Sequence, residues 1–169
     1  LPALALATEP PEDSTMTGPP RSRKERLLTP QLFIRAYFFL GVIEAILAMS
    51  RFWKYLTDHG YHYGQNLTIH HPLYIAATTM TLVAIVFSQI GNGFACRSDS
   101  VSLFKLGFFT NRFYFIGILY EIIFLIIITT VPFLIPIFGT TWIDLSYLPW
   151  LLLIPCIFIL LEESRKWVN

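Results

Sequence analysis

The chain has 169 residues, of which 54% are hydrophobic and 14% charged, and its mean hydropathy is +0.58. A soluble domain carries about 25% charged residues, and the net charge of +1 gives no basis for nucleic-acid binding. The charges gather between apolar blocks, which indicates a multi-span protein in a lipid bilayer. Cys96 and Cys156 lie in or beside apolar segments, and we predict that both are free thiols.

The first thirty residues divide into two parts. Residues 1–7 (LPALALA) are apolar but too short to span a bilayer. We interpret them as the end of a truncated membrane helix, with a hydrophobic tail as the alternative. Residues 8–30 contain five prolines, which forbid a continuous helix, and four basic residues between 21 and 26. The basic cluster predicts that this Pro/Arg-rich loop is cytoplasmic.

The first predicted span covers about residues 31–55. Gly41, Ala45 and Ala48 form a strip of small residues suited to helix packing or to the docking of a subunit. Glu44 lies beside this strip. A single carboxylate in a membrane usually faces protein, so we expect Glu44 to hydrogen-bond a neighbouring helix; an ion or proton role is the alternative.

The loop at residues 57–72 contains four histidines and the sequon Asn66-Leu67-Thr68. The histidines could be imagined as metal ligands, but no cysteine or carboxylate cluster supports them. We therefore predict a solvated loop and no metal site beyond the intramembrane candidates below.

The second predicted span, residues 73–96, contains no Asp, Glu, Lys or Arg and is long enough to cross a bilayer. Polar side chains nevertheless fall close to one face at helical spacing: Thr78, Thr81, Ser88, Gln89 and Asn92. Amides in hydrocarbon are costly unless they face protein, water or a bound ion. The sequence therefore predicts a polar working face near the C-terminal end of this helix.

The third span is predicted over about residues 113–134, with Glu121 as its single charge. Two prolines, Pro132 and Pro136, are expected to bend or end it. The fourth span is predicted over about residues 147–161, and we expect Pro149 and Pro155 to interrupt it.

The distribution of basic residues sets the predicted topology. The loops 57–72 and 138–146 hold none, whereas four, three and two lie in residues 8–30, 97–112 and 165–169. The positive-inside rule then places both termini in the cytoplasm. We predict an all-α membrane protein in which residues 31–169 form an antiparallel bundle of four transmembrane helices, preceded by the partial helix and the Pro-rich loop.

Two of these helices place polar groups at a common depth. Gln89 precedes Arg97 by eight residues, and Glu121 follows Arg112 by nine. Both side chains then lie ~12–14 Å from the cytoplasmic boundary, and Asn92 is one turn nearer to it. Such oxygen groups suit cations, and a carboxylate also suits a proton. An interhelical hydrogen bond is the structural alternative, and three groups are too few to form a complete ion path.

The sequence also resembles a known family. LPALALATEPPE and GPPRSRKERLL resemble the end of the sixth span, and the loop after it, in type II P-type cation-transporting ATPases. QIGNGFACRSDSVSLF resembles their eighth span and its exit, and LEESRKWVN resembles the end of the tenth. The resemblance covers essentially all 169 residues, in order.

The resemblance implies site residues. In this family the eighth span contributes polar ligands at the positions held by Gln89 and Asn92, and the sodium–potassium pumps carry a ninth-span acid that matches Glu121. Sarcoplasmic-type calcium pumps have an acid in place of Gln89 and an apolar residue in place of Glu121. The sodium–potassium pattern has an acid in place of Asn92. These departures slightly favour a monovalent cation or protons over calcium.

The resemblance also implies what this chain lacks. The family phosphorylates the aspartate of a DKTGT motif, and neither that motif nor a TGE loop occurs here. We therefore expect no cofactor in this chain and no ATP hydrolysis by it alone; ATP and Mg²⁺ would serve the full-length parent. The implied partners are the remaining pump domains and helices, and an accessory subunit that would dock along the first span. We expect the protein to lie in the plasma membrane. The alternatives are a free-standing four-helix scaffold or regulator and a small proton or cation channel.

Overall fold

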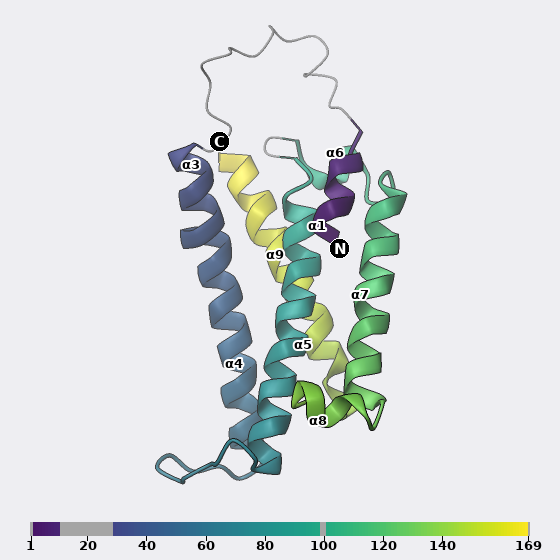
Figure 1. The fold of residues 1–169 in the computed structure, drawn as a ribbon. Coiled ribbons are helices and arrows are strands. Elements are labelled where there is room, and N and C mark those ends of the chain that lie inside the picture. Colours follow the sequence, from purple (N-terminus) through teal and green to yellow (C-terminus); the bar gives the residue numbers. More distant parts are fainter. Residues whose placement is uncertain (1, 11–28, 99–100, 169) are drawn as a thin grey trace, which may run out of the picture.

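The computed structural model describes residues 2–10, 29–98 and 101–168, and within these ranges every regular element is helical. Four helical segments are long and apolar enough to cross a membrane: Pro30–Asp58, Pro72–Ala95, Arg112–Thr130 and Leu145–Trp167. They lie side by side and alternate in direction along the chain (Figure 1). The predicted all-α four-span fold is therefore confirmed. The basic cluster between residues 21 and 26 lies outside the described residues.

The first span is built from three consecutive helical segments. Helix α3 (Pro30–Phe33) begins where the Thr29 hydroxyl accepts the Leu32 amide at 3.2 Å, and a proline suits this first position. A wide π-helical segment, η2 (Ile34–Gly41), follows, and α4 (Val42–Asp58) continues to the loop. Sequence periodicity gave no indication of the π-helical segment.

The second span, α5 (Pro72–Ala95), is the central helix of the bundle. His71 Nδ1 accepts the Leu73 amide at 3.2 Å, which caps the helix as Pro72 opens it. This span is the most buried of the four, and α4 and α9 (Leu148–Val168) pack along it. Figure 1 shows α5 and α9 crossing each other, with α5 beside α4 at the lower end of the view.

The third span ends where its prolines predicted. Helix α7 (Arg112–Thr130) begins at the Asn111 side chain, whose Oδ1 accepts the Tyr114 amide at 3.0 Å. Val131 is extended before Pro132, as expected of a residue that precedes proline. The short helix α8 (Leu134–Phe138) then leads to a left-handed Gly139 with φ of +61°.

The fourth span corrects one prediction. A short turn, η3 (Leu145–Tyr147), leads into α9, which continues unbroken through Pro149 and Pro155 to Val168. Pro149 occupies the second position of the helix, where no amide partner is required. Pro155 lies against Gly91 of α5, and such lateral packing lets a membrane helix tolerate an internal proline. The prediction that prolines interrupt this span was therefore wrong.

Two apolar clusters hold the bundle together. One joins α4, α5, α7 and α9 around the fully buried Ile154 and Phe158. The other lies nearer the chain's N-terminus, where Tyr114 of α7 is buried against α5, the short helix α6 (Leu103–Leu106), and α1 (Pro2–Ala5). The Tyr114 hydroxyl donates to the Ile90 carbonyl at 2.6 Å, so α5 and α7 are joined by a hydrogen bond as well as by packing.

Candidate functional site

The carboxylate of Glu44 and the amide of Gln89 meet between α4 and α5. Gln89 Nε2 donates to both carboxylate oxygens, at 2.9 and 3.1 Å. Gln89 is exposed in this chain and Glu44 is half-buried. The bond uses the amide nitrogen, so the carbonyl oxygen of Gln89 stays available as a ligand.

Two further polar residues follow on α5. Asn92 is half-buried, and its Oδ1 accepts from Cys96 Sγ at 3.5 Å. Ser88 is completely buried, and its hydroxyl oxygen has no hydrogen-bond partner among the described residues. Among the described residues, neither Cys96 nor Cys156 forms a disulfide.

Glu121 occupies the middle of α7 and is half-buried. Its Oε2 is inaccessible and, among the described residues, has no hydrogen-bond partner. No other carboxyl group in the described part of the chain has a buried oxygen without a partner. A carboxyl group inside a bilayer requires a partner, a proton or a cation, so Glu121 is the carboxyl group of the described residues whose requirement is not met within the chain.

The structure pairs Gln89 with a different carboxylate from Glu121, which the sequence placed at the same depth in the membrane. In the described residues no hydrogen bond joins Gln89 to Glu121, and the amide pairs instead with Glu44 of the first span. The sequence did identify all three groups as intramembrane polar residues. It could not identify their pairing, because depth along a helix does not specify which neighbour each face meets.

The strip of small residues on the first span does not form one buried face. Ala48 is 4% exposed, but Ala45 is exposed and Gly41 is half-buried at the end of the π-helical segment. Only part of this strip is used for packing within the chain. Docking of a subunit on the remainder stays a prediction.

A buried polar cluster at one end of the bundle was not predicted. The guanidinium of Arg97, 6% exposed, bonds Glu9 Oε1 at 2.6 Å and the carbonyls of Gly107 and Phe108 at 2.9 and 3.1 Å. Asn111 donates to the other Glu9 oxygen at 2.8 Å. The cluster fastens the segment after α1 to the start of α7.

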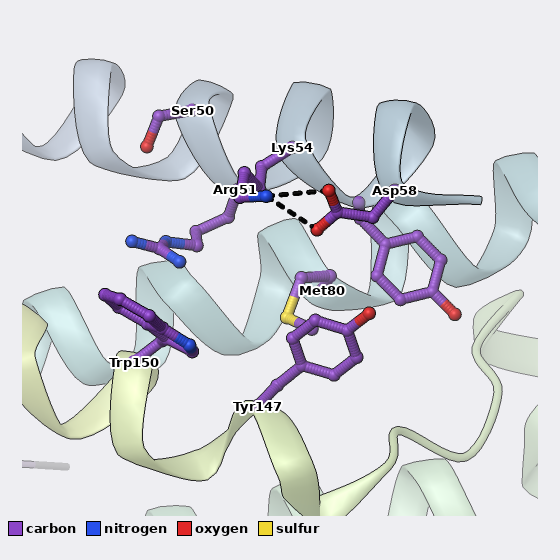
Figure 2. Close-up of a pocket in the computed structure, with 8 residues that line it drawn as sticks. Ser50, Arg51, Lys54, Asp58, Met80, Tyr147 and Trp150 are labelled. Carbon is purple, nitrogen blue, oxygen red and sulfur yellow. Dashed lines mark hydrogen bonds and ion pairs between the residues drawn. The ribbon is translucent and has the colours of Figure 1, made fainter. Parts of the chain in front are cut away.

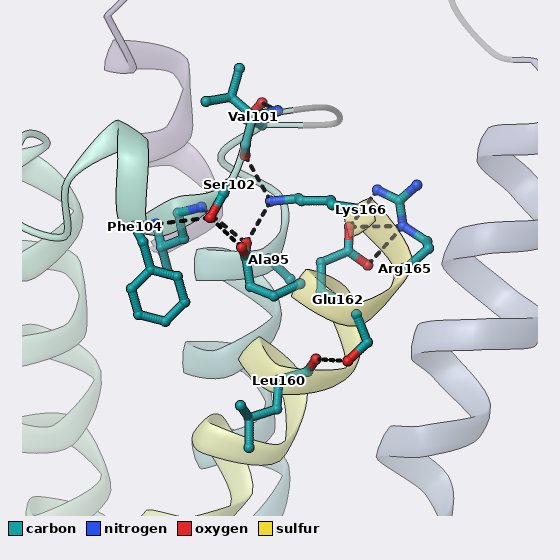
Figure 3. Close-up of polar contacts among 12 residues, drawn as sticks. Ala95, Val101, Ser102, Phe104, Leu160, Glu162, Arg165 and Lys166 are labelled. Atoms are coloured by element: carbon teal, nitrogen blue, oxygen red, sulfur yellow. Dashed lines mark hydrogen bonds and ion pairs between the residues drawn. The ribbon is translucent and has the colours of Figure 1, made fainter. Parts of the chain in front are cut away.

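A second cluster lies at the C-terminal end of α9 (Figure 3). Glu162 is 1% exposed and bonds Arg35 of η2 at 2.5 Å and Arg165 at 2.7 Å. Glu163 accepts the Leu103 amide at 2.9 Å, the Ser102 hydroxyl, and Lys166 Nζ at 3.2 Å. Together these acids connect α9 to the first span and to the loop that carries α6.

One sequence signal could have indicated the second cluster. Paired acids at residues 162 and 163 stand at the end of an apolar span, where buried charges need partners. Their partners could not be named, because Arg35 is 127 residues away from Glu162 along the chain.

Comparison with known proteins agrees with this architecture. The family model described as "Cation transporting ATPase, C-terminus" matches residues 1–168. The chain is 32% identical over 168 residues to Calcium-transporting ATPase 1 of Yarrowia lipolytica, covering 98% of the chain and 16% of that protein. It is 28% identical over 169 residues to Calcium-transporting ATPase type 2C member 2 of Mus musculus, with 98% and 16% covered.

A potassium-transporting relative matches over the same region. The Potassium-transporting ATPase alpha chain 2 of Rattus norvegicus is 26% identical over 193 residues, covering 98% of the chain and 18% of that protein. The chain thus spans less than a fifth of the length of these relatives. The family match, the four spans and the order of the segments lead to one assignment: the chain belongs to the family of C-terminal membrane regions of P-type cation-transporting ATPases.

Proposed function

We propose that this chain completes the membrane domain of an ATP-driven cation pump. It supports the helices that carry the cation path and contributes side ligands from Gln89, Asn92 and Glu121. ATP and Mg²⁺ act in the remaining domains of the pump. None of the chain's four aspartates is followed by lysine, so it offers no DKTGT phosphorylation site and does not hydrolyse ATP alone.

The carboxylate oxygen of Glu121 that has no partner among the described residues carries this proposal. Leaving a charge or a buried acceptor unsatisfied in hydrocarbon costs free energy. A transmembrane glutamate with such an oxygen therefore indicates a functional role more than a packing role. The segment α1 packs against the same helix, α7. Glu121 therefore lies on a helix that contacts the most N-terminal described segment.

The Glu44–Gln89 pair supports the same proposal in a different way. The bond holds the Gln89 side chain by its nitrogen and turns its carbonyl oxygen away from Glu44. An exposed amide in a membrane helix is costly unless another helix or a cation meets it. We place Glu44 as a positioning residue and Gln89 as the ligand.

Orientation and location belong to the proposal as well. The basic residues that flank the spans favour both termini on the cytoplasmic side. The plasma membrane is the location that we propose. The calcium- and potassium-transporting relatives leave two classes of cation to be distinguished by experiment.

The test is Glu121→Gln in the full-length protein, with ATPase activity measured against Ca²⁺, K⁺, Na⁺ and pH. We expect an apparent affinity for one cation, or for protons, that is about tenfold weaker, equivalent to about 1.4 kcal/mol. Asp144→Asn is the control, because Asp144 is exposed and caps η3 outside the membrane core. An unchanged cation and pH dependence in the Glu121→Gln protein would make this carboxylate structural.

A further inference from the structure

A pocket of about 250 Å³ opens between α4 and α9, at the end of the bundle that carries the loops 57–72 and 138–146. Its floor is Met80 of α5, which is 1% exposed. The side chains of one face of α4 form one wall, and Tyr147 and Trp150 form the other (Figure 2). The pocket is separate from Gln89, Asn92 and Glu121, none of which lines it.

The wall formed by α4 carries an excess of positive charge. Lys54 bonds both oxygens of Asp58, at 2.7 and 2.9 Å, so these two charges satisfy each other. Arg51 is left with no such carboxylate: its Nε is buried without a hydrogen-bond partner among the described residues. Figure 2 shows its guanidinium facing the Trp150 ring. The guanidinium carbon lies 5.8 Å from the centre of that ring. A guanidinium that contacts an aromatic ring through its face can still donate from the N–H groups at its edge to an anion.

The position of the pocket along the span is that of the membrane interface. Arg51 precedes the end of α4 by seven residues, or ~10 Å of helix. Tryptophan and tyrosine prefer the level of the lipid headgroups. Trp150, Tyr55 and Tyr147 surround the pocket, and the Tyr55 and Tyr147 rings lie 5.5 Å apart.

We propose that this pocket binds the phosphate of a glycerophospholipid in the leaflet at this end of the bundle. The Arg51 guanidinium donates to the phosphate oxygens, and the hydroxyl groups of Ser50 and Tyr147 lie along the same pocket. The acyl chains extend along the exposed apolar side chains of the neighbouring spans, including Ile46 and Leu153.

Charge and access favour a lipid over a free anion. Two cations and one carboxylate line the pocket, so its field attracts an anionic group. The apolar surroundings favour a phosphate that arrives attached to hydrocarbon. A polypeptide carboxylate would require a partner chain at membrane depth, whereas phospholipid is present at every copy of the protein.

The experiment uses the full-length protein in detergent, with no ATP or transported cation, so its outcome is independent of the pump proposal. Native mass spectrometry measures retention of dioleoylphosphatidylglycerol, of dioleoylglycerol, which lacks the phosphate, and of inorganic phosphate. We expect the first molecule of dioleoylphosphatidylglycerol to bind about tenfold more tightly than dioleoylglycerol. Arg51→Gln should remove that preference. Arg112→Gln, at an exposed arginine of another span, should retain it.

A second variant separates ligand loss from loss of fold. Ser50 is exposed and lines the pocket, so Ser50→Leu fills its mouth and leaves Arg51 in place. It should weaken phosphatidylglycerol binding by a similar factor. Equal retention of the two lipids by the unmodified protein would overturn the proposal, as would unchanged binding in both variants. Displacement of the lipid by millimolar inorganic phosphate would show a free-anion site instead.

Discussion

At the scale of single residues, Gly91 sets how closely α5 and α9 approach. A Cβ atom at this position would lie 2.7 Å from Pro155 Cα and 2.8 Å from Phe158 Cβ. The nearest of these atoms belongs to the backbone of a helix, which cannot move aside as the end of a flexible side chain can. The absence of a side chain thus lets two spans touch, as small residues do in membrane helix packing.

Gly91→Ala should therefore destabilise the protein. The added methyl group has to push α9 away from α5, and overpacking of this kind costs about 1–3 kcal/mol. Gly41→Ala is the matched control, because its Cβ would meet only the Ala36 carbonyl oxygen of its own helix, at 3.3 Å. Thermal unfolding of the full-length protein should show the larger loss for Gly91→Ala. Equal losses would mean that α5 and α9 do not pack at this contact.

At the scale of elements, the buried Arg97–Glu9 ion pair joins two segments that are far apart in the sequence. The side chains are 1% and 13% exposed, and their residues are 88 positions apart. Removing one partner of such a pair leaves an uncompensated charge in a poorly solvated site. The pair thus joins the residue after the turn η1 (Leu6–Thr8) to the residue that follows the C-terminal cap of α5.

Glu9→Gln should cost about 3–5 kcal/mol of stability, because it leaves the buried Arg97 guanidinium without its carboxylate. Glu9→Gln combined with Arg97→Gln should cost less than the sum of the two single changes, because the double variant leaves no lone charge. The exposed Lys54–Asp58 pair is the comparison, with an expected loss of about 0–1 kcal/mol. Chemical unfolding measures all of these; strict additivity for residues 9 and 97 would contradict the contact.

The span boundaries show what periodicity and apolar length can predict about elements. The second span was expected at residues 73–96 and is found at Pro72–Ala95, since flanking loop residues and a cap delimit it. The fourth was expected to end near residue 161 and continues to Val168. Its charged last turns looked like an exit from the membrane, but Glu162 and Glu163 are buried against Arg35 and the loop near Leu103.

At the scale of the whole molecule, the described helices form a bundle whose acidic groups are paired at one end, whereas a carboxyl group in the middle is not fully paired. Its buried charges near one end are paired, whereas Glu121 in the middle of α7 has an oxygen without a described partner. Hydropathy predicted the bundle because each span follows from its own residues. The pairing of Glu44 with Gln89 could not be predicted, because it depends on how α4 rotates against α5, which no local pattern specifies.

The most direct test of the account is ATP-driven cation uptake into proteoliposomes by the full-length protein. The unmodified protein is compared with the double variant Gln89→Leu, Glu121→Gln across a range of cation concentrations. We predict uptake by the unmodified protein and a half-maximal concentration at least about tenfold higher in the double variant. ATP-driven uptake with the same concentration dependence in both proteins would contradict the claim that these helices contribute ligands to the cation path.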